Sequence, residues 1–175
     1  MDRLAPAGRT RAGRGMSATG FVETAAGVPQ TGPLADALAT RAKLMARTEE
    51  SRIAALTPDD PGGLPLPLRA ALAARMARLC GDPATADRYA ADAGDDPSAA
   101  LADPAATGGD ARAAAILAYV DCVTLRPAEA GDAEIDALRD AGVEEGDIVR
   151  LAGLVAFVNY QLRLIAVLRA MGQAT

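Results

Sequence analysis

The 175-residue sequence contains no histidine and only two cysteines, Cys80 and Cys122. Without histidine the chain lacks the commonest general base of enzymes and their commonest metal ligand. A Ser-His-Asp or Cys-His catalytic arrangement is therefore impossible within this chain. Two cysteines without other soft ligands do not form a zinc site, and we expect neither a metal nor a cofactor.

Aromatic residues are also scarce, at 3% of the chain, and Lys43 is the only lysine. Most of the hydrophobic residues are alanine and leucine, which favour helices, whereas the β-branched and aromatic residues that favour strands are sparse. The composition therefore predicts an all-α fold. The net charge is −5, and no concentrated positive face for phosphates is expected, so nucleic acid is not an expected partner.

We expect no secretory signal, because the arginines of residues 1–15 are not followed by an apolar segment. Both thiols are then expected to be reduced, in a cytoplasmic protein. Residues 1–32 are predicted to be a disordered extension, or an extension that results from a wrongly assigned start codon upstream of the true one. Met16 is the favoured true start. Within this segment, Phe21 and Val22 can pack against the body of the protein. A single helical domain is predicted for residues 33–172.

Hydrophobic residues at helical spacing predict the secondary structure. In residues 66–80 they form one apolar stripe, Leu68, Leu72, Met76 and Leu79, and the arginines of this segment fall outside the stripe. The expected helices cover residues 33–56 with a break near Thr40, 66–80, 83–93, 110–125, 132–141 and 144–171. Asp82 and Pro83 form a helix start, because aspartate accepts a hydrogen bond from an unpaired N–H and proline suits the first helical position. The acidic segment 94–109 lacks the spacing of a calcium loop and is predicted to be solvated.

The last predicted helix is apolar on nearly all sides. Such a helix is buried in a core or in a subunit interface, so we expect oligomerisation. Polar residues interrupt its apolar run too often for a membrane span, and no membrane partner is expected. Cys122, on the predicted helix 110–125, is expected in the core.

Three segments carry a family resemblance: LPLPLRAALAARMARLCGDPATADRY (64–89), Thr124–Pro127, and DAEIDALRDAGVEEGDIVRLAGLVAFVNYQLRL (132–164). Over residues 64–170 the chain resembles the carboxymuconolactone decarboxylase and alkylhydroperoxidase D superfamily. The resemblance implies an alkylhydroperoxidase D-like bundle of about six to seven helices that forms homo-oligomers such as dimers, trimers or hexamers. The chain is also similar to a subgroup of this superfamily whose members occur beside peroxidase-like and flavin-dependent partner enzymes.

Peroxidase members of that superfamily carry a glutamate and then Cys-x-x-Cys-x-x-x-His at the next helix start. The helix N-terminus stabilises a thiolate, and the second thiol resolves the oxidised first one. In this chain the two cysteine positions correspond to Asp82 and Thr85, the histidine position to Tyr89 and the glutamate position to Ala70. All of these positions are substituted, so the resemblance supports the fold and argues against the dithiol reaction.

The candidate binding residues are Asp82, Thr85, Tyr89 and Arg163. Arg163 is included because an arginine in an apolar helix needs a carboxylate or an interface partner. Cys80 is the one catalytic candidate, since the nearby helix start can lower its thiol pKa. Structural alternatives stand beside four of these residues: helix capping for Asp82, packing for Tyr89 and Cys80, and a subunit-interface ion pair for Arg163.

Three functions agree with these observations. The first is a peroxidase-related, carboxymuconolactone-decarboxylase-like protein that has lost the dithiol site and has weak or no redox activity on its own. The second is a non-catalytic helical module that binds a small ligand or a partner. The third is a lactone-cleaving or decarboxylating enzyme that uses Asp82 with Arg163, which the lack of histidine argues against.

Overall fold

The computed structural model describes residues 20–174, and these residues form nine helices and no strand. The helices are α1 (Phe21–Ala26), α2 (Pro33–Thr40), α3 (Ala42–Leu56), α4 (Leu66–Leu79), α5 (Pro83–Ala93), the 3₁₀ helix η1 (Pro97–Ala102), α6 (Ala111–Leu125), α7 (Asp132–Asp140) and α8 (Glu145–Gln173). The all-α prediction is confirmed, and so is the break near Thr40. The helix count exceeds the prediction because the sequence pattern did not reveal the short helices α1 and η1.

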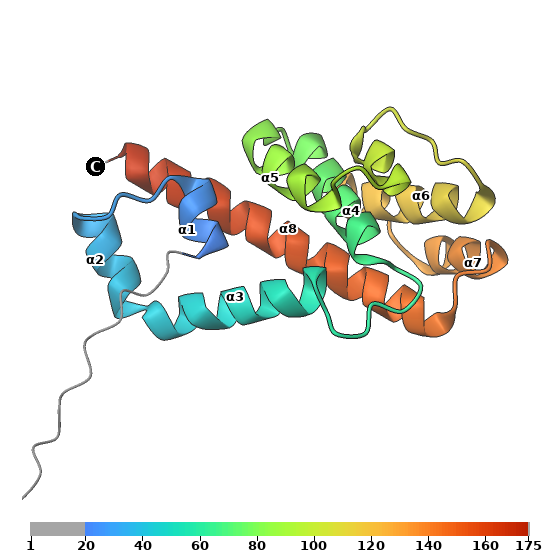
Figure 1. The fold of residues 1–175 in the computed structure, drawn as a ribbon, viewed down its shortest axis with the longest axis horizontal. Helices are drawn as coiled ribbons and strands as arrows, with labels where there is room; N and C mark the ends of the chain where they lie inside the picture. The colour runs from blue at the N-terminus through green and yellow to red at the C-terminus, as the bar shows by residue number, and fades with distance from the viewer. Residues whose placement is uncertain (1–19, 175) are drawn as a thin grey trace, which may run out of the picture.

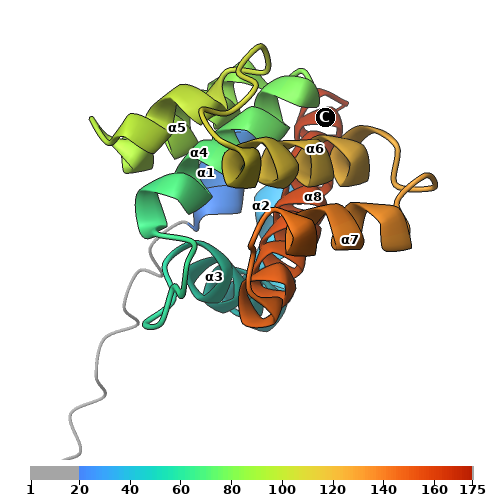
Figure 2. The ribbon, with the colours of Figure 1, turned by 90° about the vertical axis from the view of Figure 1, so that its right-hand side faces the viewer.

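Helix α8 is 29 residues long and runs through most of the length of the molecule (Figure 1). Helix α3 lies along one side of it, and α4, α5 and α6 lie on the other side (Figures 1 and 2). Helices α1 and α2 lie near the C-terminal end of α8, and α7 lies near its N-terminal end. The arrangement makes α8 the common neighbour of segments far apart in the sequence.

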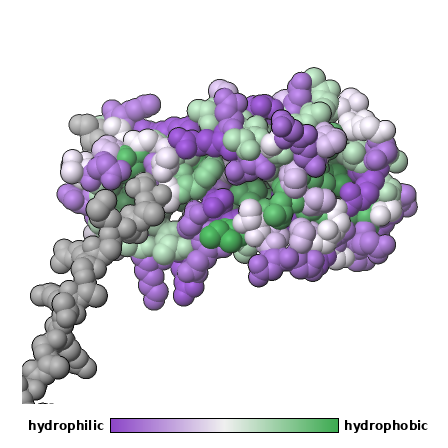
Figure 3. All heavy atoms as spheres, viewed as in Figure 1, coloured by the Kyte–Doolittle hydropathy of each residue, from purple (hydrophilic) through white to green (hydrophobic). Residues whose placement is uncertain are grey.

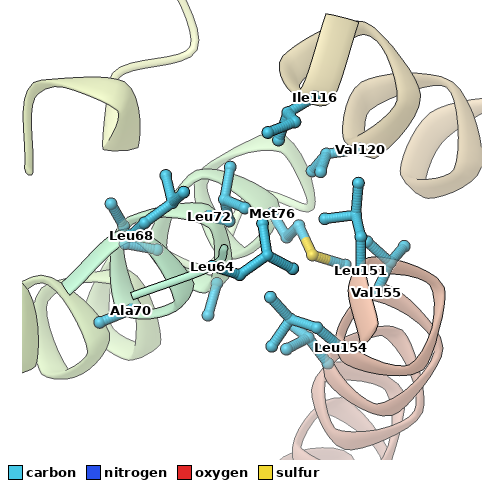
Figure 4. Close-up of a cluster of buried hydrophobic side chains, with 14 of the residues drawn as sticks. Leu64, Leu68, Ala70, Leu72, Met76, Ile116, Val120, Leu151, Leu154 and Val155 are labelled. Carbon is cyan, nitrogen blue, oxygen red and sulfur yellow. The ribbon is translucent and has the colours of Figure 1, made fainter. Parts of the chain in front are cut away.

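The main core lies where α4 meets α6 and α8 (Figure 4). Leu72 and Met76 of α4 are fully buried against Leu151 and Val155 of α8, and Val120 of α6 closes the cluster. Each such side chain stabilises the fold by about 1.5–3 kcal/mol through burial. The apolar stripe predicted for α4 is thus the centre of the molecule.

A second apolar cluster fixes the N-terminal part of the described chain. Val22 of α1 is 2% exposed and packs with Leu34 of α2 and with Ile165 and Leu168 of α8. The expected packing of Phe21 and Val22 is confirmed. The structure differs from the predicted disorder of residues 1–32, because α1 packs on α8, and residues 1–19, including Met16, lie outside the described residues.

The segment 94–109 is held more firmly than the prediction of a solvated loop implied. It contains η1, and the buried Arg75 of α4 donates from Nη1 to the carbonyl oxygen of Asp103 at 2.5 Å. Arg75 also donates from Nε and Nη2 to both carboxylate oxygens of Asp121, at 2.6 and 2.7 Å. Arg69 is buried in the same helix and donates to the carbonyls of Leu64, Ala55 and Pro61. Two arginines outside the apolar stripe therefore connect α4 to the loops around it.

By length and composition, α8 is the one helix among the described residues that is apolar enough to cross a membrane, and half of its most apolar window is buried. The core helix of a soluble protein meets the same criterion. Two arginines of α8 form ion pairs with other segments: Arg150 with Asp60 at 2.8 Å, and Arg169 with Asp82 at 2.7 Å. On the face shown in Figure 3, apolar side chains reach the surface in small areas among hydrophilic ones.

Candidate functional site

Asp82 begins α5 as its N-cap residue. Its Oδ1 accepts a hydrogen bond from the backbone N–H of Thr85 at 3.1 Å, which satisfies one of the unpaired donors of the first turn. Its Oδ2 lies 2.7 Å from Nη1 of Arg169 on α8. Burial raises the pKa of Asp82, but the hydrogen bonds from Thr85 and Arg169 outweigh it, so the pKa is lower than usual. The carboxylate is ionised and both of its oxygens have partners.

Thr85 lies one turn further along α5 and is fully buried. Its hydroxyl accepts a hydrogen bond from Nη2 of Arg169 at 3.0 Å. The same nitrogen donates to the carbonyl oxygen of Ala25, at the end of α1, at 2.9 Å. Arg169 therefore joins α8 to α5 and α1, and the Thr85 hydroxyl is one of the acceptors that hold it there.

Tyr89 is fully buried and lies on the same face of α5 as Thr85. Its hydroxyl donates to Oε1 of Gln161 on α8, whose Nε2 is buried without a hydrogen-bond partner among the described residues. The Tyr89 ring stacks on Phe21 of α1 with 5.0 Å between ring centroids. Burial raises the pKa of the phenol well above its usual value, so Tyr89 stays protonated and cannot take the proton-transfer role of a histidine.

Cys80 is an exposed residue at the C-terminal cap of α4, just before the α5 start. Partial burial of the thiol raises its pKa, Asp82 adds to this effect, and Arg163 opposes it. The helix start nearby was expected to lower this pKa, and that expectation is wrong because desolvation outweighs the nearby positive charge. A thiol of raised pKa is a poor nucleophile at neutral pH.

Cys122 lies on α6 and is buried, as the sequence predicted. Its Sγ is 3.9 Å from the carbonyl oxygen of Arg126. Neither Cys80 nor Cys122 forms a disulfide. One cysteine at the surface and one in the core do not form a dithiol pair.

Arg163 is an exposed residue of α8. Its Nη1 donates to the carbonyl oxygen of Asn159 at 2.9 Å and to Oδ1 of the same residue at 3.1 Å. No carboxylate within residues 20–174 forms an ion pair with it. The guanidinium is held in place by Asn159, while its remaining N–H groups point to no acceptor in the described chain.

A cleft of about 470 Å³ lies between the α4–α5 junction and the last turns of α8, and we call it the Cys80 cleft. It is lined by Cys80, Gly81, Asp82, Asn159, Leu162, Arg163, Ala166, Arg169, Ala170 and Gln173. The polar lining lies at the α5 start and at the two arginines, and the alanines of α8 give an apolar side. The cleft could hold a small molecule with one anionic end.

The structure thus brings together three of the predicted residues, Cys80, Asp82 and Arg163. Thr85 and Tyr89 do not line this cleft, because their face of α5 turns into the core. Sequence reasoning missed Arg169 as part of the site. The available signal was the same as for Arg163, a charged residue in an otherwise apolar helix.

No three histidine, cysteine, aspartate or glutamate side chains in residues 20–174 are placed to hold a metal ion. No family model, no curated protein and no solved structure matches the chain.

Proposed function

We propose that this chain is a carboxymuconolactone-decarboxylase-like protein that has lost the dithiol peroxidase site and binds a small carboxylate in the Cys80 cleft. The observation that carries the proposal is that the Arg163 side chain has no ionic partner in the part of the chain that the structure describes. It lines the cleft, is oriented by Asn159, and forms no ion pair with any described residue. A carboxylate supplied by a ligand is the partner that this guanidinium accepts best.

The loss of redox chemistry is supported by what occupies the two cysteine positions of the family. Asp82 caps α5 and pairs with Arg169, and Thr85 accepts a hydrogen bond from the same arginine. A dithiol cycle needs two sulfurs that can come within bonding distance. Cys80 and Cys122 do not provide them, since one is exposed and the other lies in the core.

The same contacts argue against a lactone-cleaving or decarboxylating enzyme. A general acid or base needs a pKa near the working pH and a free oxygen that can reach the substrate. Asp82 has a lowered pKa, and its two oxygens are engaged by Thr85 and Arg169. Its role in the cleft is to orient Arg169 and to cap α5.

Small-carboxylate binding is tested by titrating the protein with hexanoate and, for comparison, with neutral hexanol. We expect saturable binding of hexanoate and about tenfold weaker binding to Arg163→Gln, because one charge-assisted contact is lost. Arg47→Gln, which removes another exposed arginine on α3, is the matched control and should bind like the wild type. Equal binding of hexanoate to Arg163→Gln and wild type would contradict the proposal.

Self-association is a second proposal, favoured by the outer face of α8. Three large side chains on it remain exposed, at 71% for Val149, 55% for Val167 and 47% for Met171. Tyr160 is also 45% exposed, but its hydroxyl is hydrogen-bonded to that of Thr48 on α3. A helix that is buried on one face and apolar on the other is suited to packing against a second copy. A partner enzyme of the peroxidase-like or flavin-dependent kind would compete for the same face.

A further inference from the structure

Phe21 is the residue of α1 that makes an aromatic contact with the rest of the described chain. Its ring lies nearly parallel to the Tyr89 ring, with an angle of 21° between the planes and 5.0 Å between the centroids. The guanidinium carbon of Arg52, on α3, lies 5.4 Å from the centroid of the Phe21 ring. A single ring is thus held by an aromatic platform and by a cation, which together favour a flat π-system.

The platform does not depend on Phe21 for its position. Tyr89 is fully buried, and its hydroxyl is fixed by the hydrogen bond to Gln161 of α8. Its ring would therefore keep its place if Phe21 moved away. A site that is already formed binds a ligand without the cost of ordering it.

The charge of Arg52 is balanced within the protein. Its Nε and Nη2 both lie 2.8 Å from Oε1 of Glu49, one turn earlier on α3. This ion pair orients the guanidinium for contact with a ring and leaves little net charge to attract an acid. The site therefore favours an uncharged aromatic ring over an aromatic carboxylate.

Phe21 has room to leave this position. The ring is only half-buried and borders a hollow of about 630 Å³ that also touches Arg52, Leu56 and Ala70. Helix α1 itself is anchored by Val22, which is buried against Ile165 and Leu168 of α8. Its end is held by the hydrogen bonds from Arg169 to Ala25. These contacts keep α1 in place, so the Phe21 side chain is the part that can turn toward the hollow.

We infer that Tyr89 and Arg52 form a binding site for a planar, uncharged aromatic ring, and that Phe21 occupies this site as an internal substitute. An aromatic ligand would bind in place of the Phe21 ring and turn that side chain into the neighbouring hollow, while α1 stays packed on α8. This site is separate from the Cys80 cleft and does not depend on the carboxylate proposed there.

The first test uses indole as the probe and its fluorescence as the signal, since the chain contains no tryptophan. Phe21→Ala empties the site, and we expect saturable binding of indole with a blue-shifted emission. Wild-type protein should bind indole about 10–100-fold more weakly, because its competent open state is a minor one. Phe157→Ala removes the only other phenylalanine of the chain and should bind indole as the wild type does.

The second measurement does not require the site to be empty. Phe21→Trp introduces a single tryptophan whose emission is blue-shifted while the ring stacks on Tyr89. Adding benzyl alcohol, which is not excited at the wavelength used for tryptophan, should shift this emission to the red as the ring is displaced. Arg163→Gln in the same background should leave the shift unchanged, which separates this site from the Cys80 cleft.

Three results would overturn the inference. One is equal binding of indole to Phe21→Ala, Phe157→Ala and wild type, or binding to none of them. Another is an emission of Phe21→Trp that stays constant up to saturating benzyl alcohol. The third concerns the double variant Phe21→Ala with Arg52→Gln, which we expect to bind indole several-fold more weakly than Phe21→Ala alone. Equal binding of indole by the double variant and by Phe21→Ala would overturn the inference. If Phe21→Ala does not fold, the Phe21→Trp titration decides alone.

Discussion

Replacing Arg75 with methionine should be among the most destabilising single changes in this protein. The Arg75 side chain is 3% exposed, and its guanidinium lies between α4, α6 and the segment after η1. It forms two hydrogen bonds to Asp121 and further ones to the carbonyl oxygens of Leu101, Asp103, Pro104 and Ala106. Methionine keeps the apolar stem of the side chain and removes the guanidinium with these polar contacts.

The size of the effect follows from what is left behind. Removing one partner of a buried ion pair costs about 3–5 kcal/mol, because the other charge stays in a desolvated place. The Asp121 side chain is 28% exposed, so water can reach part of it, and the lower end of that range is expected. Carbonyl groups of the loop that lose their donor add to the loss.

The measurement is urea unfolding followed by circular dichroism. With a slope of about 2 kcal/mol per molar urea, a loss of about 3 kcal/mol lowers the midpoint by about 1.5 M. Arg78→Met on the same helix is the matched control: its nearest carboxylate oxygen, in Asp87, is 3.9 Å away and exposed, so the change should be small. Arg75→Lys should fall between the two, because lysine lacks the planar fork. If Arg75→Met and Arg78→Met shift the midpoint equally, this reasoning is wrong.

Two further predictions concern the α5 start and the outer face of α8. Asp82→Ala should lower the free energy of unfolding by about 1–2 kcal/mol at pH 7, through loss of the cap. Because the folded protein lowers the pKa of Asp82, its contribution is present above the unfolded pKa of about 4. The difference from wild type should therefore disappear as pH falls through the folded pKa, and a constant difference in unfolding curves down to low pH would contradict it. Val167→Asp should shift the protein toward monomer in light scattering, whereas Lys43→Asp, a surface change on α3, should not.

Much of the fold could be predicted because it depends on local patterns. The stripe through Leu72 and Met76 predicted both α4 and its buried face, and the pair Asp82-Pro83 predicted the start of α5. These signals act within one or two turns of helix, so the residues that carry them are close together in the sequence.

The features that were missed depend on distant partners. Arg75 is buried because Asp121, 46 residues later, accepts its hydrogen bonds. Helix α1 is too short to show a period, and it is stabilised by packing on Ile165 and Leu168 near the other end of the chain. No periodicity in a single sequence reveals such contacts.

The candidate site was predicted in part for the same reason. Asp82 and Cys80 lie near one helix start, so they were expected together, and Arg163 was singled out as a charge in an apolar helix. The packing of α8 against α5 decides the rest of the site: it turns Thr85 and Tyr89 toward the core and pairs Arg169 with Asp82. Only the tertiary arrangement gives that information.

Peroxide consumption with dithiothreitol as reductant tests the central claim most directly. The wild-type protein and Cys80→Ser would be compared with reductant and peroxide alone. We predict that both proteins give the background rate, because the protein has no thiol pair and the Cys80 thiol has a raised pKa. Turnover by the wild type that disappears in Cys80→Ser would show that this surface thiol is a peroxidase, and would contradict the account.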